Sequence, residues 1–474
     1  MPGSPTGWRR CSPRRPRETR PGPMLFQLPS FFVFLAAFAA GLALCPRRLV
    51  LAYVFLASLV FYAWWYPPYT ALILGYVAAA WIGGRLVRAH PRLLPAVVVT
   101  VLLPLLLFKY TDFVMTTLEE LTGAGLPHLG WGLPLGVSFV TFSVISLLVD
   151  TAHHPKRPFP RFGIVAVYVT FFPHLIAGPI LRLHKMVPRL SNIRIDRAAF
   201  TANAGLFAIG MMKKVLIADP IGLWIDGVIT RPGQLGIIEA WFVMLGFAVQ
   251  IYCDFSAYSD MAIGLAGMFG VAFPENFHKP YAATSMTDVW QRWHMTLSFW
   301  LRDYVYKYLR EPLGRVLAIL GTMAVSGLWH GAAWTFVVWG LIHGTIMMAE
   351  ALTGHAVRAR QSRGLARAGF ILATFLTWAV VTTFFRAPTL EVAASVIAGG
   401  FGAHGPGMLP ADAPLLAGLI LVTLALHPLD TIDRIRSATA RVPAALALPV
   451  ILVLVAGCAM IAAGRPQAFF YFDF

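Results

Sequence analysis

Charged residues are scarce in this chain. Asp, Glu, Lys and Arg make up 12% of its 474 residues, against roughly 25% in soluble globular domains. Hydrophobic residues make up 58%, and apolar runs about as long as a bilayer crossing recur at residues 49–65, 93–108, 370–385 and 444–463. This composition excludes an ordinary soluble enzyme and predicts an all-α, polytopic helical membrane protein.

The sequence also lacks the short motifs of soluble-enzyme chemistry. Its four cysteines, at positions 11, 45, 253 and 458, do not have the spacing of a zinc site or of a disulfide framework. The 13 histidines form no His-Glu-x-x-His pair, and there is no Gly-x-Ser-x-Gly elbow or phosphate-binding glycine loop. We therefore predict no metal site and no permanently bound cofactor.

Basic residues outnumber acidic ones, 38 to 21, which gives a formal charge of +17. In a soluble protein this excess would suggest nucleic-acid binding. Here the basic residues cluster in short loops between apolar runs, where Lys and Arg mark the cytoplasmic side. We therefore predict no nucleic-acid partner, and we place seven basic segments in the cytoplasm: residues 47–48, 85–92, 156–161, 182–197, 279–315, 358–367 and 434–441.

Two segments should face the outside. Residues 111–134 hold three acids and no Lys or Arg, and residues 387–415 contain no basic residue. If the chain starts outside at Met24, the first five spans alternate correctly between the two sides; they lie near residues 26–45, 49–66, 70–84, 93–110 and 135–152. We predict about eleven crossings or dips, with both ends outside and with the spans in contact with membrane lipids.

The first 23 residues differ from the rest of the chain. They hold six arginines, one acid and several prolines, and they contain neither an apolar run nor the apolar core of a signal peptide. If made, they would place six arginines on the side where the topology wants none. We therefore expect a disordered basic extension at residues 1–23, which need not be translated, a start at Met24, and one transmembrane domain over residues 24–474.

Two apolar stretches do not fit simple crossings. Residues 162–181 join two basic loops and contain Pro173, Gly178 and Pro179, so we expect them to dip in and return, or to lie in the interface. Residues 316–354 also join two basic loops, and at about 1.5 Å per residue they are barely long enough for two crossings. With His330 near the middle, a buried turning point or a broken helix pair is the expected geometry.

Ionisable side chains inside apolar segments are costly, so each one is a candidate for function. His330 lies within Ser-Gly-Leu-Trp-His-Gly-Ala-Ala-Trp at residues 326–334. Glycines allow close approach of a substrate or of other backbone, and an imidazole can take a proton from a hydroxyl. The alternative is a packing histidine that bonds to a carbonyl of a neighbouring helix.

A second candidate region covers residues 290–304 and contains His294, Arg292 and Arg302. Its aromatic and hydroxyl residues recur every three or four positions, which indicates an amphipathic helix at the cytoplasmic interface. Its cations could bind the phosphates of coenzyme A or of an acyl carrier. Structural anchoring at the interface explains the pattern equally well.

Two further groups of polar residues lie in apolar surroundings. Residues 250–260 carry two acids and four hydroxyls, which must satisfy one another or line a wet cavity. Lys213 and Lys214 either snorkel to the headgroups or line a polar tunnel. Five histidines in or beside polar loops are interpreted as ordinary solvated or interfacial residues: His153, His154, His184, His355 and His427.

These motifs together resemble the membrane-bound O-acyltransferase (MBOAT) family, in its bacterial alginate O-acetyltransferase-like branch, over roughly residues 24–474. Besides the two histidine motifs, the resemblance rests on residues 61–65 (FYAWW), 108–110 (FKY), 133–139 (LPLGVSF), 171–180 (FFPHLIAGPI), 213–219 (KKVLIAD), 252–260 (YCDFSAYSD), 274–277 (PENF) and 470–474 (FYFDF). The chain departs from the family pattern at residues 307–315, where the segment before the catalytic helix is shorter.

The resemblance implies a fold, an activity and a site. The fold would place re-entrant or interfacial helices around a central polar tunnel. His330 would be the catalytic histidine and His294 a second functional one, in a bacterial inner (plasma) membrane. Arg292 and Arg302 are predicted as donor contacts from their charge, not from the resemblance. The protein would transfer a short acyl group, most simply acetyl, from acetyl-coenzyme A or an acyl carrier in the cytoplasm.

The acceptor implied by the resemblance is a hydroxyl of an extracytoplasmic polysaccharide, reached directly or through a periplasmic acetyltransferase-like partner. D-alanyl transfer, or acylation of a lipid or protein, differs only in the group moved or in its acceptor. A transporter without catalysis is the alternative from another class. No clear pair of inverted halves is visible in the sequence, which argues against a transporter.

Overall fold

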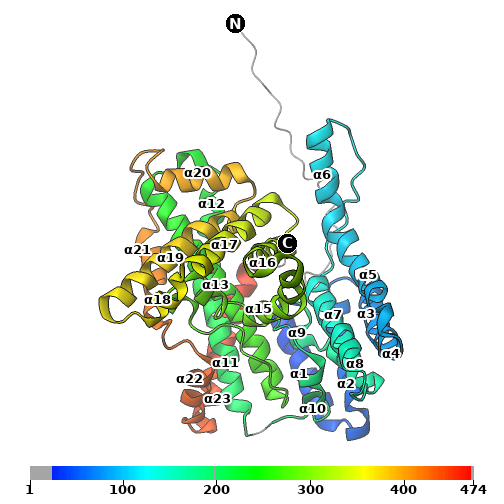
Figure 1. Cartoon of the computed structure of the whole chain (residues 1–474). Coiled ribbons are helices and arrows are strands. Elements are labelled where there is room, and N and C mark those ends of the chain that lie inside the picture. Colours follow the sequence, from blue (N-terminus) through cyan, green and yellow to red (C-terminus); the bar gives the residue numbers. More distant parts are fainter. Residues whose placement is uncertain (1–23, 197, 471–474) are drawn as a thin grey trace.

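The computed structural model describes residues 24–196 and 198–470, and every regular element in these ranges is a helix (Figure 1). Seven of the described helical runs are long and apolar enough to cross a membrane: Tyr69–Ala89, Pro91–Thr122, Ile237–Met268, Met295–His330, Trp334–Thr353, Gly364–Arg386 and Ala444–Gly464. The prediction of an all-α, polytopic membrane protein is therefore confirmed. The predictions for residues 1–23 lie outside the described residues.

The five spans predicted near the start of the chain are helical. They correspond to α1 (Pro29–Leu44), α2 (Val50–Ala63), α3 (Tyr69–Ala78) continued by α4 (Gly84–Ala89), α5 (Leu94–Leu105) and α7 (Val137–His153). The end of α1 follows from the sequence, because Cys45 precedes Pro46 and a residue before proline is driven out of the helical region. Cys45 is accordingly extended, with φ −72° and ψ 128°.

Both predicted outer segments contain a helix. A π-helical turn joins α5 to α6 (Thr111–Thr122), so the first half of residues 111–134 is helical. Helix α6 contains no proline or glycine, and it ends at Gly123, whose left-handed φ of 70° suits glycine. A second helix, α20 (Leu390–Gly400), lies within the other predicted outer segment.

The two predicted outer segments lie at the same end of the molecule. Figure 1 shows α6 and α20 at the top, and α10 (Leu183–Leu190) and α22 (Ile432–Ala440) at the opposite end. These last two helices belong to segments predicted to be cytoplasmic. The arrangement agrees with the predicted alternation, while the number of about eleven crossings or dips stays a prediction.

The core is built around α13 (Ile237–Met268). Of its most apolar window 67% is buried, against 39% or less in the other six candidate spans, so α13 faces protein on most sides. It packs against α11 (Phe200–Met212), α12 (Asp219–Val228) and α19 (Gly364–Arg386). Near the end of the chain, α21 (Ala413–Leu426) packs against α13, and α23 (Ala444–Gly464) packs against α11.

Neither of the two irregular stretches is a simple crossing, and whether residues 162–181 dip into the membrane or lie in its interface stays a prediction. Residues 162–181 form the short helices α8 (Phe162–Thr170) and α9 (Phe172–Leu175). At 1.5 Å per residue α8 is about 14 Å long, too short for a bilayer core of about 30 Å, so this stretch is not a simple crossing. The other stretch is a broken helix pair, α16 (Lys307–His330) and α17 (Trp334–Thr353), with His330 at the turn.

Candidate functional site

His330 is the last residue of α16 and is 3% exposed. Gly327 on α16 and Gly340 on α17 allow the two helix backbones to lie in contact. The approach is so close that a Cβ on Gly340 would clash with the carbonyl oxygen of Met323. Gly331 then turns the chain in an extended conformation toward α17. The glycines around the histidine thus hold a tight turn deep in the protein, as their spacing suggested.

A buried lysine caps the helix that ends at His330. The Nζ of Lys109 donates to the carbonyl oxygens of Trp329 at 2.5 Å and His330 at 3.1 Å, and Tyr110 donates to Leu328 at 2.9 Å. Carbonyls at a helix C-terminus have no partner within the helix and carry partial negative charge. Lys109 and Tyr110 therefore fix the backbone that carries the imidazole.

His294 does not lie in an interfacial amphipathic helix, so that prediction is wrong. The chain forms α14 (Met286–Trp290), breaks, and resumes as α15 (Met295–Leu301). His294 sits at the break with a left-handed φ of 42° and is fully buried. Aromatic and hydroxyl residues that recur every three or four positions occur both on surface helices and on helical turns that are buried on all sides, so the spacing does not distinguish the two. Neither a glycine nor a proline marks this break.

The two arginines predicted as donor contacts lie nearer the surface than the histidines. Arg292 Nε lies 2.8 Å from Asp288 Oδ1, and its side chain is 27% exposed. Arg302 Nε lies 2.7 Å from Asp303 Oδ1, and its side chain is 60% exposed. The structure therefore separates the predicted site into a buried histidine part and an outer cationic part.

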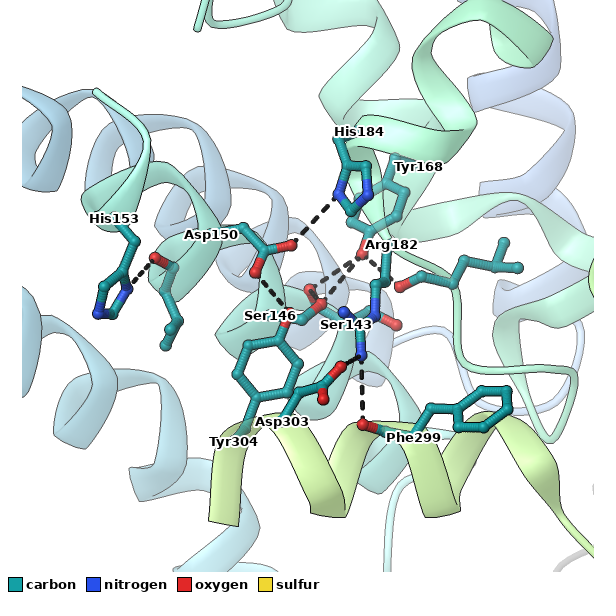
Figure 2. A network of polar contacts seen from close by, with 12 residues as sticks. Ser143, Ser146, Asp150, His153, Tyr168, Arg182, His184, Phe299, Asp303 and Tyr304 are labelled. Carbon is teal, nitrogen blue, oxygen red and sulfur yellow. Dashed lines mark hydrogen bonds and ion pairs between the residues drawn. The ribbon is translucent and has the colours of Figure 1, made fainter. Parts of the chain in front are cut away.

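The segment that follows α15 is tied down by a polar network (Figure 2). Arg182 pairs with Asp303 and also donates to the carbonyl oxygen of Phe299 at 3.2 Å. Asp150 of α7 accepts a 2.6 Å hydrogen bond from Tyr304 and lies 3.3 Å from His184 Nδ1. Burial lowers the pKa of His184, although Asp150 acts in the opposite direction. The network fixes α15 relative to α7 and α10.

Tryptophans and histidines surround His330 and form what we call the histidine cluster: Trp290, His294, Ser326, Trp329, His330, Trp339 and His343. The ring of His330 lies 4.9 Å from that of Trp329 and 5.1 Å from that of Trp339, and Trp339 lies 4.7 Å from His343. Trp329 also contacts His294, at 6.1 Å. All seven side chains are buried.

Many polar atoms of the histidine cluster have no hydrogen-bond partner within the described residues. They are Nε2 of His294, Oγ of Ser326, both ring nitrogens of His343, and Nε1 of Trp290, Trp329 and Trp339. Buried polar groups are nearly always satisfied, so a concentration of exceptions indicates a place that water or a substrate occupies.

A second polar centre is paired throughout, and we call it the ion-pair cluster: Lys213, Lys214, Asp219, Asp254, Asp260 and Asp430. Lys213 Nζ lies 2.5 Å from Asp260 and 3.0 Å from Asp430, while Lys214 Nζ lies 2.7 Å from both Asp219 and Asp254. Both lysines are buried, so the interpretation that they snorkel to the headgroups is wrong. The acids of residues 250–260 are satisfied from within the protein, one of the two expectations for them.

His427, predicted to be an ordinary solvated or interfacial residue, is 4% exposed. Its Nε2 accepts a 3.0 Å hydrogen bond from the backbone N–H of Tyr281, and burial lowers its pKa to about 4. The prediction was wrong because the acids and basic residues after position 427 suggested a polar loop, whereas the loop folds back onto α13 through Asp430. Among the described residues, no group of three or more His, Cys, Asp or Glu side chains is placed to hold a metal ion.

A cavity of about 440 Å³ opens between α14, α16, α17 and α18 (His355–Gln361). Its lining includes Arg315 and Arg360, both exposed, and the acids Asp288 and Glu350. The acids are already engaged: Glu350 accepts from the backbone of Met286 at 2.7 Å, and Asp288 holds Arg292. The cations are thus the groups left for a ligand.

Sequence reasoning assigned no role to three residues that organise these centres. Lys109 and Asn276 were quoted only as parts of motifs, and Asp430 was not singled out. Each contacts a residue outside its own motif: Lys109 contacts His330, Asn276 contacts His294, and Asp430 contacts Lys213. The one available signal was a lysine, Lys109, inside an otherwise apolar run.

Residues 95–386 match a family model described as MBOAT, membrane-bound O-acyltransferase family. The matched range includes both predicted histidines, the Lys109 cap and most of the ion-pair cluster. It ends at the last residue of α19.

The chain is also similar to curated proteins of bacteria. It is 36% identical to the probable alginate O-acetylase AlgI of Pseudomonas aeruginosa over 379 residues, which cover 76% of this chain and 72% of that protein. It is 33% identical to the peptidoglycan O-acetyltransferase of Helicobacter pylori, over 74% of this chain and 73% of that protein. A more distant similarity, 28%, is to the teichoic acid D-alanyltransferase of Bacillus subtilis, over 45% of this chain and 58% of that protein.

Proposed function

The chain belongs to the membrane-bound O-acyltransferase family and is an O-acyltransferase of the membrane, and from this premise we propose that it transfers acetyl groups to an exported polysaccharide. Two relatives similar over about three quarters of the chain are named for O-acetylation of polysaccharides, alginate and peptidoglycan. The teichoic acid D-alanyltransferase is similar over less than half of it. Acetyl is therefore favoured over D-alanyl as the group moved.

His330 acts as the general base. The acceptor oxygen attacks the thioester carbonyl carbon of the donor while the imidazole takes the hydroxyl proton. The C–S bond then breaks, and the leaving thiolate receives the proton back from the imidazolium. The observation that carries this proposal is the placement of His330 at a rigid, capped turn, beside His294, Ser326 and His343, whose Nε2, Oγ and two ring nitrogens have no hydrogen-bond partner within the described residues.

His294 shares the site with His330 through their common neighbour Trp329. It binds or orients one of the two substrates beside the reacting carbonyl. Its burial and its fixed backbone break suit a group that must hold one orientation.

The donor enters from the cytoplasm as acetyl-coenzyme A or as an acetylated carrier. Positive charge surrounds the proposed entrance, because Arg315 and Arg360 line the 440 Å³ cavity and Arg292 stands beside it through Asp288. Arg302 adds a further exposed cation on the segment after α15. Guanidinium groups are suited to the phosphates that either donor carries.

The acceptor is a hydroxyl on the outer side of a bacterial inner membrane, belonging to the polysaccharide itself or to an extracytoplasmic acetyltransferase-like partner. Both routes need the same chemistry at His330. They differ in whether an acetylated protein intermediate accumulates outside the membrane.

The test is the acetyl content of the exported polymer in cells that carry His330→Ala or His330→Gln. Protein amounts in the membrane must equal those of the unchanged protein, and His90→Ala, at an exposed position, serves as the matched control. Loss of acetylation in both His330 variants is the expected result. Near-normal acetylation in both would reject the catalytic role and favour transport without catalysis.

A further inference from the structure

Asn276 lies in the loop between α13 and α14, and it holds the start of α15 with both its backbone and its side chain. Its carbonyl oxygen accepts from the N–H of Met295 at 2.9 Å, and its Oδ1 accepts from the N–H of Thr296 at 3.2 Å. These N–H groups lie in the first turn of α15 and have no partner within the helix. Asn276 therefore does the work of a helix cap, which leaves the side chain of His294 free for another role.

The orientation of the Asn276 amide follows from its donors. The backbone N–H of Thr296 can only donate, so the atom facing it must be the oxygen. The Thr296 hydroxyl accepts from the N–H of Ile180 at 3.0 Å and so turns its own hydrogen toward the same oxygen, at 2.9 Å. On the other side, the amide nitrogen donates to Ser259 Oγ at 3.0 Å. Both ends of the amide are fixed.

The fixed oxygen sets the tautomer of His294. Nδ1 of His294 lies 3.1 Å from Asn276 Oδ1, and because this oxygen has no hydrogen to give, Nδ1 must carry the N–H. In a neutral imidazole the other nitrogen, Nε2, then bears a lone pair. Nε2 is buried and has no hydrogen-bond partner within the described residues.

We propose that Asn276 is a positioning residue, which holds His294 in this tautomer so that Nε2 accepts a hydrogen bond from a substrate group in the site. The inference rests on the proposed function and names the chemistry of one contact: the substrate presents an N–H or O–H to Nε2. An acyl donor with amide N–H groups and an acyl acceptor with hydroxyls both have this chemistry. The separate KM values of these two substrates distinguish which of them contacts Nε2.

The surroundings of His294 contain little that could reverse this tautomer. Its ring contacts those of Phe139 on α7, Phe255 on α13 and Trp329 on α16. The His294 ring also contacts that of Phe277, which follows Asn276 in the chain, just as Trp329 precedes His330. The titratable groups that act electrostatically on His330 are His294, Lys109 and His343. A protonated lysine has only hydrogens to give, so the Lys109 ammonium cannot compete with Asn276 Oδ1 for the hydrogen on Nδ1.

Asn276→Asp provides the sharpest test. A carboxylate keeps the acceptors for Thr296 and Nδ1, but it favours the imidazolium, in which Nε2 carries a hydrogen and cannot accept. We expect turnover per folded protein to fall about tenfold at neutral pH, the size of one lost hydrogen bond, and to recover as the pH rises. The assay uses membrane vesicles supplied with labelled acetyl-coenzyme A, and label in the polysaccharide is measured across pH.

Three controls separate positioning from folding. Thr296→Val disturbs the same helix start without changing the tautomer, so its pH profile should match that of the unchanged protein. Asn192→Asp places a new carboxylate at an exposed position and should change nothing. In a His294→Ala background, Asn276→Asp should produce no further pH shift, since the group it acts through is gone.

A second pair of variants keeps the inference testable if Asn276→Asp fails to accumulate. His294→Gln offers an acceptor near the position of Nε2, whereas His294→Asn offers only a donor near that of Nδ1. We expect His294→Gln to retain more activity, with the larger rise in KM for whichever substrate contacts Nε2. Equal activity of the two, or an unshifted pH profile in folded Asn276→Asp, would overturn the inference. The proposed function itself fails only if His330→Ala still acetylates.

Discussion

The histidine cluster and the ion-pair cluster are both buried polar centres, but they differ in how completely their atoms are paired. In the ion-pair cluster each lysine has two carboxylate partners within 3.0 Å, and Tyr252 adds a hydrogen bond of 2.6 Å to Asp430. In the histidine cluster several ring nitrogens and a hydroxyl have no partner within the described residues. Saturated polar groups hold a fold together, whereas groups left open at similar depth are available for a substrate.

The comparison predicts opposite consequences for substitutions in the two clusters. A change in the histidine cluster should reduce turnover and leave the protein folded. A change in the ion-pair cluster should reduce the amount of folded protein and leave the activity of each folded molecule close to normal.

The largest effect is expected for His330→Ala. Positioned general-base catalysis contributes about 10²–10⁴-fold, so turnover should fall by about that factor. Thermal unfolding of the detergent-solubilised protein should stay within a few degrees of that of the unchanged protein. If His330→Ala lost activity only because it unfolded, the histidine cluster would contribute to stability in the same way as the ion-pair cluster, contrary to the comparison.

Lys214→Met should show the reverse behaviour. It leaves Asp219 and Asp254 buried without their cation, and breaking a buried pair in this way costs about 3–5 kcal/mol. We expect a large drop in membrane protein level and in unfolding temperature. Lys185→Met, at an exposed position of α10, is the matched control. Normal stability with lost turnover would assign the ion-pair cluster to the reaction instead.

Lys109→Met tests a residue that shares a property with each cluster. Lys109 has hydrogen-bond partners within the protein, as the lysines of the ion-pair cluster do, but it holds the turn that carries His330. Hydrogen bonds to charged groups contribute about 1.5–3 kcal/mol, so turnover should fall by about ten- to a hundredfold if the misplaced turn is felt mainly in the transition state. Kinetics in membrane vesicles should show the loss in kcat. Lys307→Met, exposed at the other end of α16, should leave kcat unchanged. An equal loss of kcat in Lys307→Met would show that the effect is not specific to the contact between Lys109 and the His330 turn.

The smallest effect is expected at the outer cations. Exposed ion pairs contribute about 0–1 kcal/mol, so Arg302→Gln or Arg292→Gln should raise the donor KM by up to about fivefold and leave kcat unchanged. Acceptor KM should not move. Arg310→Gln, another exposed arginine, is the control. A fall in kcat for Arg302→Gln would place this surface residue in the catalytic part of the site.

The sequence predicted the class of fold and the buried turn at His330, because both depend on local signals. Apolar runs of bilayer length mark helices, and the glycines beside His330 mark a tight turn. The sequence did not predict the break at His294, since the partner that makes it possible, Asn276, contacts it across 18 positions. It left the role of Lys213 and Lys214 open, because their acid partners lie on α12, on α13 and in the loop after α21.

The cap on α16 also has a consequence for how the protein is made. Lys109 and its acceptor at Trp329 are 220 positions apart. A ribosome that adds about 5–20 residues per second takes roughly 10–45 s to reach the second after the first. During that interval the carbonyls of Trp329 and His330 do not yet exist, so we expect the ammonium group of Lys109 to stay in water or among lipid headgroups. We therefore expect the helix that carries Lys109 to settle at its final depth when the α16–α17 turn is made, together with assembly of the site.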